Sequence, residues 1–148
     1  MEFNRILILI DDSAGAIRAA RYGYGLAREL GAKVALLSVV DAALAEGNVD
    51  AGIFPEQEGS KLKLAAEELL HNLRNDYGQG VETEIFAPEG EVKKIVLQMA
   101  REWKAKIVVL GSHGRSGLTK LLMGSVAEEV IRHSPVPVFV VPLDKGKG

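Results

Sequence analysis

The most constraining feature of the sequence is a run of apolar residues close to its start. Residues 6–10 read Ile-Leu-Ile-Leu-Ile and are apolar on both faces of an extended strand. A strand of this kind is buried on both sides, as it is in a parallel sheet whose two faces carry helices. We therefore predict a central strand at residues 5–10, for which the rest of the chain supplies neighbours and covering helices.

Strand-like and helix-like segments alternate after this run. Further strands are predicted at residues 33–40, 81–86, 106–110 and 138–141, with 81–86 and 138–141 at sheet edges. Helices are predicted at residues 13–30, 61–75, 89–103 and 125–133. The first helix should direct one apolar stripe at the core: Ile17, Ala20, Tyr24, Ala27 and Leu30. Residues 41–60 are expected to form a long loop, and residues 144–148 a disordered tail. This alternation predicts one α/β domain over residues 1–148, with a five-stranded parallel sheet and helices on both faces.

Composition excludes several classes of function. The chain has a formal net charge of -2, so no positive field favours nucleic acid or an anionic membrane as a partner. It has no cysteine, which excludes disulfides and thiolate chemistry, and the distant His71, His113 and His133 predict no metal site. No apolar run reaches the roughly 18 residues of a membrane span. The start of the chain lacks a signal-peptide layout, so a cytoplasmic location is expected.

Two pairs of small residues carry the clearest chemical signal. Gly111 and Gly114 follow the strand predicted at 106–110, and Gly124 and Ser125 open the last predicted helix. Glycine lets the backbone approach a phosphate closely. A helix N-terminus presents unpaired N–H groups and about half a positive charge. The two turns therefore predict an anion site at the carboxyl edge of the sheet, where ligands of such sheets bind.

The side chains around these turns allow two interpretations. Arg115 and Lys120 could add positive charge to the anion site, and the Ser125 hydroxyl could donate to a phosphate oxygen. Alternatively, Ser125 and Glu128 match a capping box, in which the serine only caps its own helix and binds no ligand.

The same residues resemble those of a known family. Residues 111–125 fit the pattern G-x2-G-x9-G-S, and the surrounding segments 108–117 and 124–130 are similar to the ATP-binding universal stress proteins. Residues 6–13, 37–41 and 134–138 resemble that family as well. The resemblance implies a Rossmann-like sheet of the adenine-nucleotide alpha hydrolase type with strand order 3-2-1-4-5.

The resemblance also implies a ligand, which is ATP, or else AMP or ADP, with Mg or Mn. Asp11 would lie beside the ribose and adenine, and the main chain of Val39 would hydrogen-bond the adenine edge. The residues implied at the site are Ile10, Asp11, Val39, Leu110, Gly111, Ser112, His113, Gly114, Arg115, Gly124, Ser125 and Val126. Structural roles stay open for Asp11, as a turn residue, and for His113, as a loop stabiliser. Asp12 stands where the family often has glycine, and it could repel a triphosphate, help hold a cation or cap the helix.

Three functions remain open at this stage: a nucleotide-dependent regulatory module of the stress response, a slow ATPase or phosphotransferase, and a nucleotide-free scaffold with an anion site. The first is favoured because the chain has no G-x4-G-K-[ST] loop and no evident catalytic residue. The resemblance further implies a homodimer through residues 138–141, whose apolar edge invites pairing, and an unidentified regulatory protein partner.

Overall fold

The computed structural model describes residues 1–11, 15–41, 55–113 and 123–142, without the side chains of 55–58. In chain order, its elements are β1 (Arg5–Leu9), α1 (Gly15–Leu30), β2 (Lys33–Leu37), β3 (Val40–Asp41), α3 (Pro55–Tyr77), β4 (Thr83–Phe86), β5 (Glu89–Gly90), α4 (Val92–Glu102), β6 (Ile107–Gly111), α5 (Ser125–His133) and β7 (Val138–Val141). The tail 144–148 lies outside the described residues.

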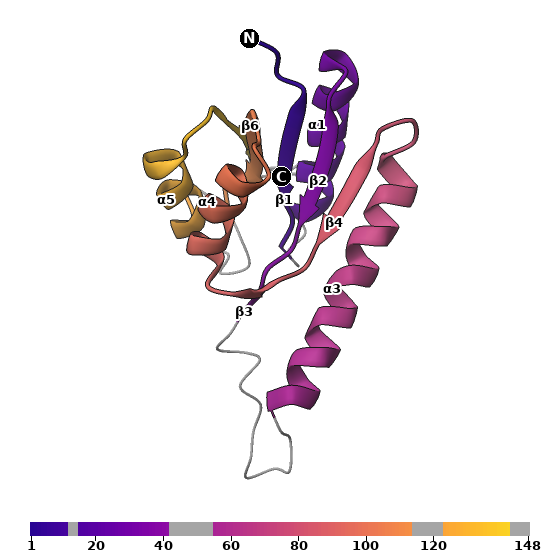
Figure 1. Cartoon of the computed structure of the whole chain (residues 1–148), viewed down its shortest axis with the longest axis vertical. Coiled ribbons are helices and arrows are strands. Elements are labelled where there is room, and N and C mark those ends of the chain that lie inside the picture. Colours follow the sequence, from indigo (N-terminus) through magenta and orange to yellow (C-terminus); the bar gives the residue numbers. More distant parts are fainter. Residues whose placement is uncertain (12–14, 42–54, 114–122, 143–148) are drawn as a thin grey trace, which may run out of the picture.

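The main sheet has five parallel strands in the order β4-β2-β1-β6-β7 (Figure 1). This is the predicted order 3-2-1-4-5 with the strands renumbered, and the predicted strands at 81–86 and 138–141 do lie at the two edges. In the register, Ile8 of β1 lies beside Leu36 of β2 and Val109 of β6. The apolar run at 6–10 therefore occupies the centre of the sheet, as predicted.

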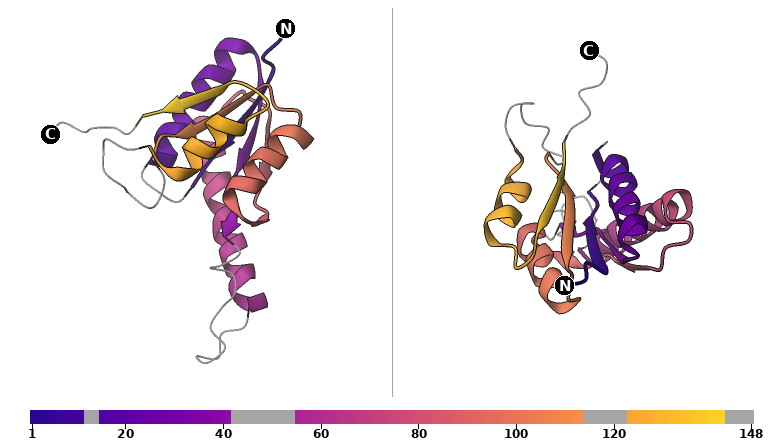
Figure 2. Two further views of the ribbon diagram at one scale, coloured as in Figure 1. Left: turned by 90° about the vertical axis from the view of Figure 1, so that its left-hand side faces the viewer. Right: turned by 90° about the horizontal axis from the view of Figure 1, so that it is seen from above.

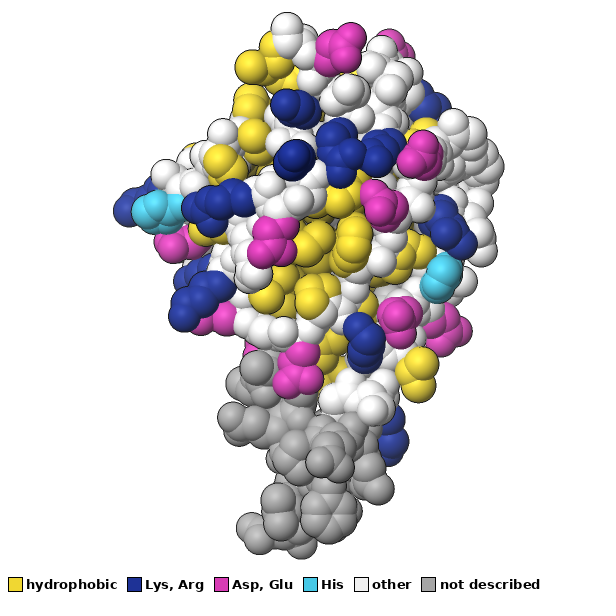
Figure 3. Space-filling view, viewed as in Figure 1, with side chains coloured by type: hydrophobic (Ala, Val, Ile, Leu, Met, Phe, Trp, Pro, Cys, Tyr) yellow, Lys and Arg dark blue, Asp and Glu magenta, His cyan; other side chains and the backbone are white. Residues whose placement is uncertain are grey.

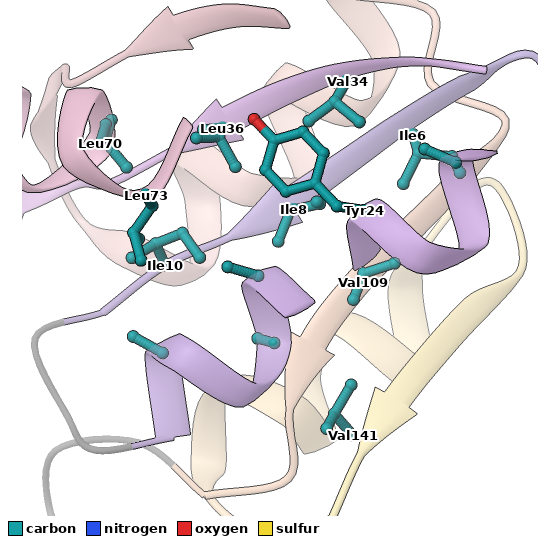
Figure 4. Packing of buried hydrophobic residues seen from close by; sticks show 14 of the residues in the cluster. Ile6, Ile8, Ile10, Tyr24, Val34, Leu36, Leu70, Leu73, Val109 and Val141 are labelled. Atoms are coloured by element: carbon teal, nitrogen blue, oxygen red, sulfur yellow. The ribbon is translucent and has the colours of Figure 1, made fainter. Parts of the chain in front are cut away.

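Helices cover both faces of this sheet (Figure 2). The core on one face consists of residues from β1, β2 and β6 packed against α1 and α3. Tyr24 of α1 lies over Ile8 there, as Figure 4 shows, and its hydroxyl is 2.9 Å from Oγ1 of Thr83. The other core lies beneath α4 and α5. Successive residues of a strand point to opposite faces, so every central strand contributes to both cores.

The inward face of α1 differs from the predicted stripe. Ile17 and Leu30 are 48% and 41% exposed, so the prediction was wrong for these two positions. Small residues make most of the contact instead, and the buried positions of the helix are Ala16, Ala19, Ala20, Gly23, Tyr24 and Ala27. A Cβ atom on Gly23 would collide with the side chain of Ile8. Small side chains thus let α1 approach the sheet more closely than larger ones would.

The second predicted strand, 33–40, is divided in the structure. β2 ends at Leu37, and Val40–Asp41 pairs with Glu89–Gly90 in a separate two-stranded sheet. The N–H of Val40 donates to the carbonyl of Pro88 at 2.8 Å, but Pro88 has no N–H with which to continue the ladder. The helix expected from residue 89 consequently begins at Val92.

The expected loop 41–60 is also shorter than predicted, because α3 begins at Pro55. Proline suits the first position of a helix, where its fixed φ is favourable and its missing N–H would have no partner. The first turns of α3 extend beyond the carboxyl ends of the strands (Figure 1). The helix therefore passes the edge of the sheet where ligands of this fold class bind.

The face of the molecule that Figure 3 shows carries charges of both signs around exposed hydrophobic side chains. Acidic and basic side chains are mixed there, so this face presents no field of a single sign. No helix within the described ranges combines the length and apolarity that crossing a bilayer requires.

Candidate functional site

A cavity of about 480 Å³ opens at the carboxyl ends of β1, β2 and β6. The chain passes from β1 to β2 on one side and reaches β6 on the other, so the strand order reverses at β1. In open α/β sheets, ligands bind at such a reversal point. The volume falls within the range of roughly 300–1,000 Å³ that is typical of small-molecule sites.

The cavity brings together most of the residues predicted from the sequence. Those that line it are Ile10, Asp11, Val39, Leu110, Gly111, His113, Gly124, Ser125 and Val126. Ser112 is buried and does not line the cavity; its hydroxyl lies 2.9 Å from Nδ1 of His113. This contact restrains the orientation of the imidazole ring. Gly114 and Arg115 lie outside the described residues, as do Asp12 and Lys120.

The hydrogen bonds just beyond the end of β2 leave the main-chain N–H and C=O of Val39 facing the cavity. The N–H groups of Ser38 and Val40 donate to Phe86 and Pro88, at 3.0 and 2.8 Å. In a parallel strand, the polar groups of alternate residues point to opposite sides, so those of Val39 point towards β1. The pairing of β1 with β2 ends at the bond from the N–H of Ile10 to the carbonyl of Leu37. Beyond this bond, an N–H and a C=O of Val39 border the cavity between the two strands.

The N-terminus of α5 forms the opposite end of the cavity. Gly124 is the N-cap, with φ -66° and ψ 154°, and no side chain of the described residues caps the helix. Ser125 is therefore the first helical residue, and the capping-box interpretation is wrong. The first donor within the helix is the N–H of Glu128, which bonds the Gly124 carbonyl at 3.1 Å. The preceding amides of the first turn have no acceptor within the helix, and the residues that carry them line the cavity.

Apolar side chains from α1 and α3 form the walls between these two ends. None of these wall residues was predicted to belong to the site: Ala16, Ala19, Leu62, Ala65, Ala66 and Leu69. Inward-facing alanine and leucine on a helix are typical of any core, so no local signal separates a ligand wall from ordinary packing. Ser38, Val40 and Val92 were likewise missed, because the divided strand and the small second sheet were not predicted.

Acidic groups also border the cavity. Asp11 and Asp41 both line it, from the ends of β1 and β3. A carboxylate accepts hydrogen bonds and suits the hydroxyl groups of a sugar. Among residues 1–11, 15–41, 55–113 and 123–142, no group of three or more His, Asp or Glu is arranged to hold a metal ion.

Comparison with known proteins agrees with this architecture. Residues 2–142 match the sequence model of the universal stress protein family. This chain belongs to that family. Universal stress protein MJ0531 of Methanocaldococcus jannaschii is 32% identical over 146 residues, which cover 97% of this chain and 84% of that protein. Universal stress protein YxiE of Bacillus subtilis is 30% identical over 146 residues, with 94% of this chain and 99% of YxiE covered.

Solved structures of other universal stress proteins and their relatives share the fold. The hypothetical protein MJ0577 superposes with a TM-score of 0.86 at 25% identity, covering 99% of this universal stress protein and 100% of MJ0577. A universal stress protein in complex with cAMP gives a TM-score of 0.71 at 19% identity, covering 97% and 100% of the two chains. One from Archaeoglobus fulgidus in complex with dAMP gives 0.59 at 21%, covering 95% and 98%.

Proposed function

We propose that this universal stress protein binds ATP, or AMP or ADP, in the cavity at the carboxyl edge of its sheet. Nucleotide occupancy would make it a regulatory module of the stress response, with at most slow hydrolysis of ATP. One observation carries the proposal: a single cavity joins apolar walls, a main-chain edge of Val39 that no described strand pairs, and the N-terminus of α5, which no described side chain caps. These three features match the base and the phosphates of a nucleotide.

The base would occupy the end of the cavity between β2 and the two covering helices. The walls there are aliphatic and would bury a flat ring, with Ala19, Ala66 and Leu69 among them. Adenine presents a ring nitrogen that accepts and an amino group that donates. The N–H and C=O of Val39 present the complementary donor and acceptor on one strand edge.

The phosphates would lie at the other end, between Gly111 and the first turn of α5. Gly111 has no positive φ, and a Cβ there would meet no described atom outside its immediate chain neighbours closer than the His113 carbonyl oxygen, at 3.5 Å. Neither strain nor packing against the described residues requires glycine at this position. Its role is explained if the missing side chain leaves room for a ligand at the cavity wall.

The magnitudes are adequate for a physiological ligand. A hydrogen bond to a charged group contributes roughly 1.5–3 kcal/mol net. Micromolar affinity corresponds to about 8 kcal/mol. Four or five such bonds to phosphate, with burial of the base, exceed this value before the cost of ordering is subtracted. Mg or Mn would accompany the triphosphate, held by its phosphates.

A regulatory module fits the cavity better than a fast enzyme. Phosphoryl transfer needs an oriented nucleophile and positioned positive charge. In the described part of the cavity wall, the candidates are Asp11, Asp41 and His113, and His113 is bonded to a serine hydroxyl. We expect ATP turnover far below the roughly 1–100 s⁻¹ of kinases.

The experiment is calorimetry of the purified protein with ATP, AMP, adenosine and inorganic phosphate, followed by product analysis over hours. The proposal expects micromolar ATP binding, weaker adenosine binding and almost no product. Phosphate binding as tight as ATP would support the nucleotide-free anion scaffold instead. Rapid release of ADP or AMP would support the enzyme. Mass spectrometry of small molecules released from gently purified protein identifies the ligand independently.

We also propose a homodimer through β7. This strand is at the edge of the sheet, so one row of its main-chain groups has no neighbouring strand within the described structure. The side chain of Phe139 in this strand is 38% exposed, and its neighbours Val138 and Val140 are half-buried. Light scattering at tens of micromolar, a concentration at which ordinary dimers persist, tests the assembly. A cytoplasmic location and a regulatory protein partner remain parts of the same proposal.

A further inference from the structure

Ser38 is an unusual residue in the wall of the cavity. It is 8% exposed and lines the cavity at the end of β2. The other buried polar residues within the described ranges are Ser112 and His113, and these two bond each other at 2.9 Å. Among the described residues, the Ser38 hydroxyl has no hydrogen-bond partner. A buried polar group without a partner is costly, so such a group is expected to meet a ligand or water.

The position of Ser38 in the strand determines where its hydroxyl points. The bonds of Ser38 and Val40 to Phe86 and Pro88 keep the chain extended beyond the end of β2. Side chains alternate along an extended strand, so Ser38 shares a face with Leu36. Leu36 packs in the core beneath α1 and α3. The hydroxyl therefore lies on the side of the cavity whose walls come from those helices.

The hydroxyl is open to the cavity. No side-chain oxygen or nitrogen of the described residues is both sealed from its surroundings and without a partner. Since the hydroxyl of Ser38 has no partner, it is accessible, and the cavity is the space that its residue lines. It is one residue before Val39, whose main-chain edge borders the same space. A hydroxyl and an amide edge thus stand side by side at the apolar end of the cavity.

We infer that Ser38 determines specificity for the base by accepting a hydrogen bond from the exocyclic amino group of adenine. This inference rests on the proposed nucleotide binding. An adenine whose ring nitrogen and amino group meet Val39 retains a second amino hydrogen that requires an acceptor. Asp11 and Asp41 already have interactions of their own. In the described part of the cavity wall, Ser38 is the polar side chain next to Val39 that has none.

The test compares two ligands on three proteins by calorimetry. The ligands are AMP and purine riboside 5'-monophosphate, which carries hydrogen in place of the amino group. The proteins are the wild type, Ser38→Ala and Ser60→Ala, a control at an exposed serine of α3. Thermal unfolding without ligand verifies that the variants are folded. The inference predicts that the wild type binds AMP more tightly than the analogue, and that Ser38→Ala weakens AMP binding about 3- to 10-fold. It also predicts that Ser38→Ala leaves binding of the analogue unchanged, and that Ser60→Ala changes neither ligand.

Two results would overturn the inference. If Ser38→Ala weakens both ligands equally, the hydroxyl contacts the sugar or supports the fold and does not read the amino group. If it weakens neither ligand, Ser38 does not contact the nucleotide. These outcomes leave the proposed function intact because the wild type still binds AMP. If the wild type binds neither ligand, the proposed function fails, and the role of Ser38 fails with it.

Discussion

Ser125 offers a substitution whose effects on stability and on binding should have opposite signs. It is the exposed first residue of α5 and lines the cavity. In Ser125→Asp, a carboxylate at the helix N-terminus should add roughly 0.3–1 kcal/mol to the free energy of unfolding through the helix dipole. The same carboxylate would stand where the proposed phosphates bind. The variant should therefore be slightly more stable and clearly weaker in nucleotide affinity.

The expected loss of ATP affinity in Ser125→Asp depends on the solvent exposure of this position. Two unit charges 4 Å apart repel by about 1 kcal/mol in water and about 4 kcal/mol at the effective dielectric constant near a protein surface. Ser125 is exposed at the mouth of the cavity, so we expect a value of about 2 kcal/mol, which is close to a 30-fold weaker Kd for ATP. AMP, with less charge, should lose less, and adenosine should lose almost nothing.

The matched control is Ser125→Asn, which has nearly the same shape and no charge. Urea denaturation measures stability, and calorimetry with ATP, AMP and adenosine measures affinity. At about 1 M salt the Debye length is roughly 3 Å, so the difference between the Asp and Asn variants should shrink. Equal ATP affinity of the two variants at low salt would refute the placement of the phosphates at α5. Equal loss of adenosine and ATP would show that the substitution merely disturbs the cavity.

Three further predictions concern the scaffold. Gly23→Ala should destabilise the protein by about 1 kcal/mol, because overpacking against Ile8 costs roughly 1–3 kcal/mol and the better helix propensity of alanine returns about 1. Adding Ile8→Val removes the Cδ1 atom, so urea denaturation should find the double variant more stable than the sum of the singles, and additivity would contradict the contact. Burial raises the pKa of the Tyr24 phenol above its usual 10.0, so the stability that this shift provides is present below pH 10 and is lost as the pH rises beyond it. In Tyr24→Phe, the free energy of unfolding, measured by denaturation at several pH values, should fall less steeply above pH 10. An unchanged pH dependence would show that Tyr24 does not cause the loss. Phe139→Lys on the exposed edge of β7 should convert a dimer into monomers by light scattering without lowering the unfolding temperature of the monomer, whereas a persistent dimer would place the interface elsewhere.

The sequence predicted the order of elements well because its strongest signals are local. A run that is apolar on both faces can be satisfied only between two layers of helices, and β1, β2 and β6 are indeed buried strands of this kind. The start of α5 at Ser125 was also predicted correctly. The alternative in which Ser125 and Glu128 form a capping box was wrong, because the N-cap lies one residue earlier, at Gly124, which has no side chain.

The other wrong predictions concern positions where contacts between distant segments determine the local structure. Residues 38–41 continue an apolar pattern, but Pro88 interrupts the neighbouring strand, and a separate pair forms between β3 and β5. Periodicity predicted Ile17 and Leu30 on the inner face of α1. Because the helix approaches the sheet closely at Gly23, its small residues face the sheet instead. Neither effect can be predicted from the sequence of a single helix or strand.

The sequence by itself determined the layered α/β architecture and the two glycine-bearing turns, since apolar periodicity and backbone freedom are properties of short segments. Only the tertiary structure decided which side chains surround the space between those turns. Alanine and leucine on α1 and α3 look like any core residues until the helices pass the edge of the sheet and leave a cavity there. The same holds for Ser38, whose hydroxyl becomes significant only because packing places it in the cavity wall, where no described residue bonds it.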